Sequence, residues 1–340
     1  MKNKAILLVN LGSPDSTSIP DVRRYLNEFL MDGRVIDMPY WRRFLLVKGI
    51  ITPFRAPRSA HAYEKIWTDQ GSPLIVITEQ QRKALEDLTG WPVYIAMRYG
   101  SPHPGVAFAN MMADLPSLEE VIVIPLYPHY AMSSYETAVV QVREIHRKAC
   151  YPFRLSIIPP FYNNPGYIDA LAASIRPYLD QPYDHLLFSY HGIPERHLDK
   201  VDPRGKHVMA EGQCCLDAPE AQKKCYRHQV FETTRLVVEK LGIPEGRYSI
   251  SFQSRLGKGW LEPFTDVRFQ ELPEQGVKNL LVVSPAFVSD CLETLEELVM
   301  AGRETFLKAG GESYQVIPCM NDQEGWIKAI ASLVKKEYLQ

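Results

Sequence analysis

The chain has 340 residues, of which 46% are hydrophobic and 23% charged, and its formal net charge is −2. One ordinary core rarely organises so long a chain, so we expect two domains or one large α/β unit. The near-balanced charge gives no general field for nucleic acid, and no nucleic-acid partner is expected. No apolar run reaches the roughly 18 residues that span a bilayer. The chain enters an apolar strand at once, without a cleavable signal pattern, which favours a cytoplasmic location.

The first half of the chain alternates short apolar runs with amphipathic stretches. A glycine or proline closes each apolar run or follows it within a few residues, as is typical of buried parallel strands. Strands are predicted at residues 4–12, 93–97, 120–125 and 153–158. Helices are predicted at residues 21–31, 78–88, 106–115 and 135–146.

Residues 39–57 differ from this pattern, because aromatic and aliphatic residues there are interleaved with arginine and lysine. One interpretation is a core helix with solvated basic edges. The other is an amphipathic lip that touches a flat apolar anion or a membrane surface. The second interpretation would place a cytoplasmic protein in peripheral contact with the inner face of the membrane.

The alternation of strands and helices begins again in the second half. Strands are predicted at residues 185–190, 248–252, 280–284 and 314–317. Helices are predicted at residues 167–178, 231–241, 290–307 and 324–338. Strands and helices at this spacing give parallel sheets with helices on both faces. The predicted fold class is therefore α/β, with two Rossmann-like domains that each hold a four-stranded parallel sheet flanked by helices.

The boundary between the two domains is predicted near residue 150. The first domain takes residues 1–150 together with residues 320–340, whose helix returns to it, and the second takes residues 151–319. A weak internal echo supports two similar halves, because Glu136-Thr137 and Glu293-Thr294 each open a helix after a strand and a proline. No Gly-x-Gly-x-x-Gly or P-loop motif follows any strand, so a nucleotide-binding interpretation lacks its phosphate cradle.

Two predicted strand ends carry residues suited to chemistry. His191 follows the apolar run 185–188 and precedes Gly192 and a proline turn. In open α/β folds, ligands bind at the carboxyl ends of the strands. Arg98 and Tyr99 end another strand, and a cation beside an aromatic suits an anionic, planar ligand. The alternative for His191 is a loop histidine that hydrogen-bonds its own turn.

Glu293 lies early in the helix that follows the 280–284 strand, so its carboxylate also faces the strand ends. The alternative is that Asp290, Glu293, Glu296 and Glu297 only complement the helix dipole. If His191 and Glu293 converge, the pair can bind a divalent ion such as Fe²⁺ or relay protons. Two protein ligands are too few for a structural metal site, so an ion held there would be transient.

Three cysteines, Cys214, Cys215 and Cys225, lie in a polar, loop-rich insert at residues 199–227. Thiolates at such spacing suit a [2Fe–2S] cluster or zinc, whereas the alternative is a set of inert thiols. A fourth ligand is missing nearby. The distant candidates are Cys150, in first place, and then His207 and His228.

Several ordered motifs resemble one family. Ser189 to Pro194 resembles the signature of ferrochelatases, lyases that insert Fe²⁺ into protoporphyrin IX to form protohaem in the last step of haem biosynthesis. Residues 289–297 resemble the second catalytic segment of that family, and residues 253–257 with 260–263 resemble the third. Further matches lie, in order, at residues 9–14, 71–74, 98–100 and 127–130. The resemblance covers nearly the whole chain and implies two chelatase-type domains around a porphyrin cleft.

The resemblance also implies roles for single residues. The implied catalytic residues are His191, Glu293 and, as a supporting acid, Asp290, and the first two are also the implied metal contacts. The implied substrate-binding residues are Arg98, Tyr99, Tyr130 and Trp260. Some bacterial members carry a [2Fe–2S] cluster on a similar insert, which implies Cys214, Cys215 and Cys225 as ligands, and Cys150 stays the first candidate for the fourth.

A mechanism then follows for the insertion of iron. A cleft that holds the porphyrin bent would expose the nitrogen lone pairs. A neutral His191 would take the pyrrole protons, and Glu293 would carry them out or present the ion. Arg98 and the basic lip would steer the propionates. Two alternatives remain: a chelatase for another tetrapyrrole or metal, such as coproporphyrin III or cobalt, and a non-catalytic haem-binding protein.

Overall fold

A computed structural model describes residues 3–202, 219–255 and 257–338 of the chain. These residues form two compact units. Unit 1 consists of Met1–Leu126, Met132–Pro159 and Ile330–Gln340. Unit 2 consists of Tyr127–Ala131 and Pro160–Ala329.

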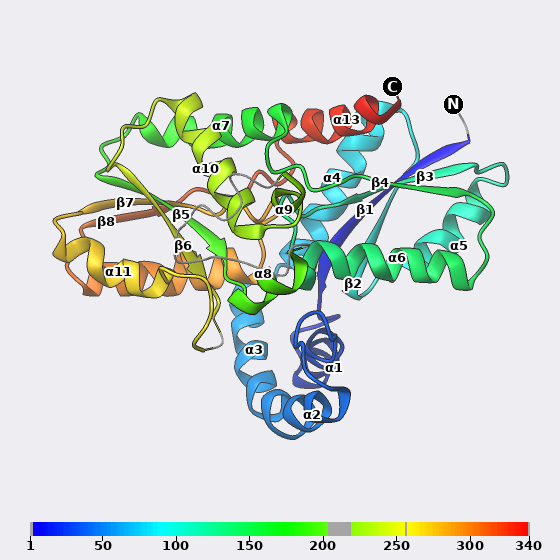
Figure 1. Ribbon diagram of the computed structural model, residues 1–340, viewed down its shortest axis with the longest axis horizontal. Helices are drawn as coiled ribbons and strands as arrows, with labels where there is room; N and C mark the ends of the chain where they lie inside the picture. The colour runs from blue at the N-terminus through cyan, green and yellow to red at the C-terminus, as the bar shows by residue number, and fades with distance from the viewer. Residues whose placement is uncertain (1–2, 203–218, 256, 339–340) are drawn as a thin grey trace. The chain divides into compact units, whose positions relative to one another are not determined.

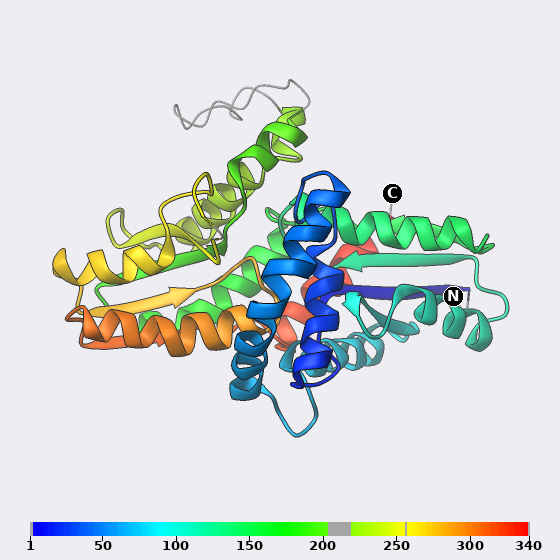
Figure 2. The same ribbon diagram turned by 90° about the horizontal axis from the view of Figure 1, so that it is seen from below.

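Unit 1 is built on a parallel sheet with the strand order β2-β1-β3-β4. Its strands are β1 (Lys4–Ser13), β2 (Val93–Gly100), β3 (Glu120–Pro125) and β4 (Arg154–Ile157). Its further elements are α4 (Pro73–Thr89), α5 (Pro104–Asp114), η2 (Met132–Glu136) and α6 (Thr137–Lys148). Helices α4 and α6 lie on opposite sides of the strands (Figure 1, Figure 2). The side chains from Ala5 to Val9 are fully buried, as expected for a central strand covered on both faces.

A helical arm, residues 19–66, leaves the carboxyl end of β1. It consists of α1 (Ile19–Leu30), α2 (Tyr40–Phe44), the π-helix η1 (Leu45–Ile51) and α3 (Thr52–Ile66). Helix α1 begins at the N-cap Ser18, whose side chain accepts a hydrogen bond from the backbone N–H of Asp21. Its buried residues are Val22, Tyr25, Leu26 and Leu30, and it packs against α3 (Figure 1).

The 39–57 segment lies within this arm and exposes much of its apolar surface. Trp41 is 60% exposed, Leu45 61% and Phe54 74%, whereas Val47 and Ala56 are fully buried. The interpretation as a core helix is therefore wrong, because only one side of the segment packs against protein. Among the described residues, no helix combines the length and the apolar character that crossing a membrane requires.

Unit 2 repeats the topology of unit 1, with the strand order β6-β5-β7-β8 and every pair parallel. Its strands are β5 (His185–His191), β6 (Tyr248–Gln253), β7 (Asn279–Val283) and β8 (Ser313–Val316). Its helices are α7 (Pro165–Leu179), α8 (Glu195–Val201), α9 (Pro219–Gln222), α10 (Tyr226–Leu241), α11 (Thr265–Glu274), the π-helix η4 (Glu293–Gly302) and α12 (Arg303–Lys308). Helix α13 (Glu324–Tyr338) starts in unit 2 and ends in unit 1. Helices α7 and α10 pack together on one side of the sheet, and α11 and α12 pack together on the other (Figure 1).

The predicted fold class, two four-stranded parallel sheets flanked by helices, is confirmed. The internal echo is also visible in three dimensions, because β3 and β7 occupy the same place in their sheets and each leads to a π-helix. The helix predicted at residues 290–307 begins later, at Glu293, and its first ten residues are π-helical. Hydrophobic periodicity predicts that a helix exists, but it does not distinguish i+4 from i+5 hydrogen bonding.

Candidate active site

His191 is the last residue of β5, and its backbone carbonyl and its ring have different hydrogen-bond partners. The ring atom Nδ1 lies 2.6 Å from the carbonyl oxygen of Gly192. Because a carbonyl can only accept, Nδ1 is the donor, and a neutral ring then carries its lone pair on Nε2. The buried hydroxyl of Tyr226 donates to the backbone carbonyl of His191 at 2.8 Å. The ring therefore hydrogen-bonds its own turn, as the alternative interpretation of His191 predicted. The same hydrogen bond leaves Nε2 as the basic atom of the ring.

Gly192 is required by close packing rather than by its backbone angles. A Cβ added at this position would lie 2.8 Å from the carbonyl oxygen of Gln253 and 3.4 Å from the ring of Trp260. The backbone N–H of Leu261 also donates to the carbonyl of Ile193 at 3.1 Å. The signature around His191 and the segment around Trp260 therefore lie side by side.

Gln253 links the strand of His191 to Glu293. It lies opposite His191 in the β5–β6 register. Its side-chain oxygen accepts a hydrogen bond from Ser189 at 2.7 Å, and its side-chain nitrogen donates to the backbone carbonyl of Glu293 at 3.1 Å. The prediction that His191 and Glu293 belong to one site is consistent with this link. Sequence reasoning placed Gln253 in a motif but gave it no role.

Glu293 is the first residue of the π-helix η4. Cys291 lies next to its carboxylate, and burial together with this carboxylate raises the pKa of the Cys291 thiol well above its usual value. One helical turn further on, the Glu297 carboxylate accepts a hydrogen bond from Ser254, whose φ of 63° is positive. π-Helices and positive φ values in non-glycine residues are both enriched at functional sites.

Asp290, the predicted supporting acid, is buried just before η4. Its carboxylate accepts hydrogen bonds from the side chains of Thr294 at 2.9 Å and Asn321 at 2.7 Å. Asn321 lies beyond β8, and no signal in the sequence singled it out.

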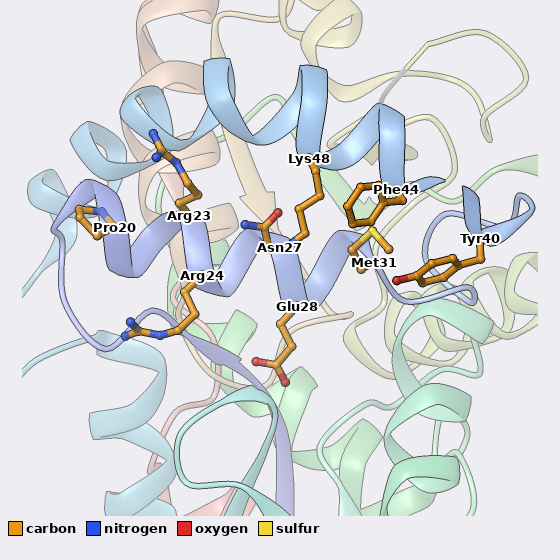
Figure 3. A pocket seen from close by; sticks show the side chains of 9 residues that line it. All are labelled: Pro20, Arg23, Arg24, Asn27, Glu28, Met31, Tyr40, Phe44 and Lys48. Atoms are coloured by element: carbon orange, nitrogen blue, oxygen red, sulfur yellow. The ribbon is translucent and has the colours of Figure 1, made fainter. Parts of the chain in front are cut away.

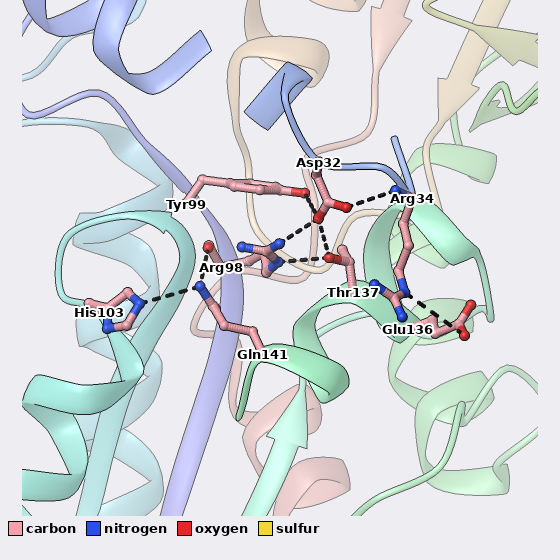
Figure 4. Close-up of polar contacts among 8 residues, drawn as sticks. All are labelled: Asp32, Arg34, Arg98, Tyr99, His103, Glu136, Thr137 and Gln141. Atoms are coloured by element: carbon pink, nitrogen blue, oxygen red, sulfur yellow. Dashed lines mark hydrogen bonds and ion pairs between the residues drawn. The ribbon is translucent and has the colours of Figure 1, made fainter. Parts of the chain in front are cut away.

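Arg98 and Tyr99 lie in unit 1, where their side chains take part in a buried network (Figure 4). The Arg98 guanidinium pairs with the Asp32 carboxylate and donates to Thr137 at 2.8 Å. The Tyr99 ring is fully buried, and its hydroxyl donates to Asp32 at 3.0 Å. Burial opposes the charge of Asp32, but hydrogen bonds from Thr137 and the backbone N–H of Arg34, together with the Arg98 charge, hold its pKa below the usual value.

Tyr130 belongs to unit 2 and is largely buried. Its backbone N–H donates to the Gln229 side chain at 2.7 Å. The neighbouring His129 is buried between Tyr190 and Tyr226, and burial lowers the pKa of His129 to about 3. His129 is therefore neutral at physiological pH, and it packs against Tyr226, whose hydroxyl donates to the His191 carbonyl.

Two of the four predicted cluster ligands, Cys214 and Cys215, lie outside the described residues. Cys225 is buried at the N-cap of α10, and its sulfur accepts the backbone N–H of His228 at 3.5 Å. Cys150 is an exposed residue of unit 1, and its thiol donates to the Arg147 carbonyl at 3.6 Å. In the part of the chain that the structure describes, no three metal-binding side chains come together.

A separate hollow of about 710 Å³ lies in unit 1, between α1 and the segment that follows it (Figure 3). Its lining combines cations with apolar groups and consists of Pro20, Arg23, Arg24, Asn27, Glu28, Met31, Tyr40, Phe44 and Lys48. None of the predicted catalytic residues lines this hollow.

The two repeated α/β units, each with a four-stranded parallel sheet, have the fold of solved chelatase structures. Two solved structures from Bacillus subtilis share the fold. They are SirB with Fe³⁺, at a TM-score of 0.55 and 12% identity, and the sirohydrochlorin chelatase SirB in complex with cobalt, at 0.52 and 11%. Each match covers 98% of this chain, and they cover 95% and 94% of the respective solved chains.

The family itself is shown by sequence. The ferrochelatase family model matches residues 3–338. A ferrochelatase of Opitutus terrae is 51% identical over 98% of both chains. A ferrochelatase of Pseudomonas entomophila is 49% identical over 98% of this chain and 99% of its own. The chain belongs to the ferrochelatase family.

Proposed function

We propose that this protein inserts Fe²⁺ into protoporphyrin IX and releases protohaem. The observation that supports the proposal is the link through Gln253 in unit 2. Gln253, on the neighbouring strand β6, lies opposite His191 in the β5–β6 register and donates a hydrogen bond to the backbone carbonyl of Glu293. The neutral His191 ring has its lone pair on Nε2. A base and an acid held on adjacent elements suit a reaction that removes protons from one molecule and adds a divalent ion to it.

The reaction exchanges two protons for one metal ion. Protoporphyrin carries two inner N–H groups, and both must leave as four nitrogens come to bind Fe²⁺. His191 Nε2 accepts a pyrrole proton, and Glu293 carries protons away from the ring or presents the ion to it. The charge balances, because the dication replaces two protons. General-base catalysis of this kind contributes typically about 10²- to 10⁴-fold in rate.

The predicted substrate-binding residues divide into two kinds. Trp260 is half-buried beside Gly192, and we propose that its ring forms part of the porphyrin wall. Tyr99 and Tyr130 are buried, and the Arg98 guanidinium pairs with Asp32. We propose that these three residues stabilise the folds of their own units rather than bind the propionates.

An anaerobic assay of the purified protein with Fe²⁺ and protoporphyrin IX tests the proposal. We expect the absorbance of the free porphyrin to give way to that of haem. Parallel reactions with Co²⁺ and with coproporphyrin III test the other chelatase activities, and faster turnover with either would reassign the substrate. Binding of porphyrin with no insertion of any metal would favour the non-catalytic haem-binding protein.

We further propose that the 39–57 segment contacts a membrane from the cytoplasmic side. Its exposed apolar side chains include Trp41, Leu45 and Phe54, and Met38 to Tyr63 contains no Asp or Glu to repel anionic lipid. Phe54→Ser should weaken sedimentation with vesicles that contain phosphatidylglycerol, whereas Leu88→Ser, at a 48% exposed position elsewhere in unit 1, should not. Equal sedimentation of both variants and the wild type would refute this contact.

A [2Fe–2S] cluster is a separate proposal, with Cys150, Cys214, Cys215 and Cys225 as its ligands. The donor set fits in kind, because thiolates hold such clusters and Cys225 already accepts a backbone N–H at its sulfur. No step of iron insertion depends on it. Protein purified without air should be coloured and contain bound iron, and Cys225→Ser should lose both properties. A colourless, iron-free preparation would remove the cluster.

A further inference from the structure

Asn321 is bonded to the segment before η4 through both its backbone and its side chain. Its backbone N–H donates to the carbonyl of Val288 at 2.9 Å. Its side-chain oxygen accepts the backbone N–H of Asp290 at 2.9 Å, and its side-chain nitrogen donates to the Asp290 carboxylate at 2.7 Å. Asn321 has a φ of 46°, a left-handed conformation that asparagine tolerates better than most residues. The amide is therefore held in one orientation, with both of its polar ends in use.

The Asp290 carboxylate bonds to protein groups through both of its oxygens. One oxygen accepts from Asn321, and the other accepts from the Thr294 hydroxyl at 2.9 Å and lies 3.4 Å from the backbone nitrogen of Cys319. Asp290 is only 9% exposed. Hydrogen bonds to both oxygens therefore hold the Asp290 carboxylate in one orientation.

Hydrogen bonds on two sides of Glu293 fix its backbone. The Thr294 hydroxyl, one residue after Glu293, ties the first turn of η4 back to Asp290. From the other side, Gln253 donates to the Glu293 carbonyl. The position of the Glu293 carboxylate therefore depends on the pairing between Asp290 and Asn321 as well as on the strand of His191.

We propose that Asn321 and Asp290 form a positioning pair that aims Glu293 at the reaction, and that Asp290 is not itself a carrier of protons. The inference rests on the proposed function, because it assigns Glu293 a role in iron insertion. It makes Asn321 a functional residue, although it lies 28 residues beyond Glu293 in the sequence.

Exchanging the two side chains tests the proposal. Asn321→Asp sets one carboxylate against another, and Asp290→Asn sets one amide NH₂ against another. In the double variant, the amide again donates to the carboxylate, the amide oxygen again accepts from Thr294, and the backbone N–H at position 290 again meets an oxygen. We expect each single variant to lower kcat about tenfold or more, with the KM for porphyrin changed by less than about twofold. The double variant should recover to within about threefold of the wild type.

Asn164→Asp is the matched control, because Asn164 caps α7 through its side-chain oxygen and aspartate caps as well. It should keep wild-type kcat. Asn321→Gly tolerates the positive φ and removes the amide without adding a charge, so it should reproduce the fall in kcat if Asn321→Asp does not fold.

Two results would overturn the proposal. A folded double variant as inactive as Asp290→Asn would make Asp290 a proton carrier, and an Asn321→Asp variant with normal kcat would remove the positioning role. Failure of the proposed function is a different result, because the wild type would then insert no metal. In that case, urea unfolding of the wild type, the two single variants and the double variant still measures the coupling energy between positions 290 and 321. If the two substitutions change the free energy of unfolding additively, the pairing is refuted.

Discussion

The carboxyl ends of the strands in unit 1 and unit 2 carry comparable polar residues that are used differently. In unit 1, Arg98 on β2 neutralises Asp32, and Thr137 after η2 bonds to the same carboxylate (Figure 4). In unit 2, Gln253 on the corresponding strand β6 is neutral and holds the backbone of Glu293. The polar residues of unit 1 thus satisfy one another.

The polar residues of unit 2 are positioned through neutral groups. Tyr226 holds the His191 carbonyl, Gly192 accepts from its ring, and the Cys291 thiol lies beside Glu293. Glu136, the counterpart of Glu293 in the internal echo, lies 4.0 Å from the Arg34 guanidinium instead. In one topology, the polar residues of unit 1 therefore pair as opposite charges, whereas the acid and the base proposed for catalysis in unit 2 are held by uncharged partners.

Of the substitutions that test this comparison of the two units, removal of the His191 imidazole should have the largest effect. His191→Ala should lower kcat/KM for haem formation about 10³-fold, because it removes the group that accepts the pyrrole proton. The measurement is anaerobic turnover of Fe²⁺ and protoporphyrin IX by a variant with an unchanged circular dichroism spectrum. His61→Ala, at an exposed position of unit 1, should keep wild-type turnover, and a fully active His191→Ala would show that unit 2 is not the catalytic unit.

Loss of the ion pair in unit 1 should cost stability. Arg98→Ala leaves the Asp32 carboxylate buried without its cation, which should cost about 3 kcal/mol in the free energy of unfolding. Arg24→Ala removes a cation paired with Asp15 and Asp21 at a 61% exposed position, and should lower the free energy of unfolding much less, because solvent screens an exposed pair. Urea unfolding measures both values. Equal losses in the two variants would mean that the buried network is no more important than a surface pair.

Glu293→Gln keeps the shape of the side chain and removes its charge. Because the amide cannot carry a proton or attract Fe²⁺ as the carboxylate does, kcat should fall about 10²-fold, with little change in the free energy of unfolding. Glu304→Gln, in the exposed part of the following helix, is the matched control and should leave kcat unchanged. A Glu293 variant that loses stability but keeps kcat would place this residue with the structural acids of unit 1.

Tyr226→Phe removes one hydroxyl donor from the His191 carbonyl. One hydrogen bond contributes about 1 kcal/mol, so kcat/KM should fall about fivefold. Tyr167→Phe is the control in the same unit, since its buried hydroxyl donates to the Pro285 carbonyl at 2.8 Å. The control should lose similar stability and keep kcat/KM. The same fall in both variants would show that the loss reflects general packing and not the position of His191.

The smallest effect concerns acid stability in unit 1. The folded pKa of Asp32 lies below its ordinary value of 3.8, so its network contributes stability that is fully present above that value. This contribution is lost as the pH falls through the folded pKa. The difference in Tm between the wild type and Asp32→Asn should therefore be constant at higher pH and shrink only below 3.8. Shrinkage between pH 7 and pH 5 would mean that another group controls the network.

The sequence by itself determined the local features of this protein. Apolar runs closed by glycine or proline fixed the strands, and their alternation with amphipathic helices predicted two parallel sheets. His191 and Glu293 could be singled out because each lies where a strand or helix adjoins the ligand-binding edge of a sheet. The ordered motifs indicated the family from the sequence alone.

The tertiary structure alone decided which polar groups face one another. The partner of Arg98 is Asp32, 66 residues away, and the partner of Asp290 is Asn321, 31 residues away. No local pattern encodes such pairs, since they arise only when separate strands and loops pack at one sheet edge. For the same reason the sequence could assign Arg98 to a ligand, whereas the folded chain shows its charge already balanced by a buried carboxylate.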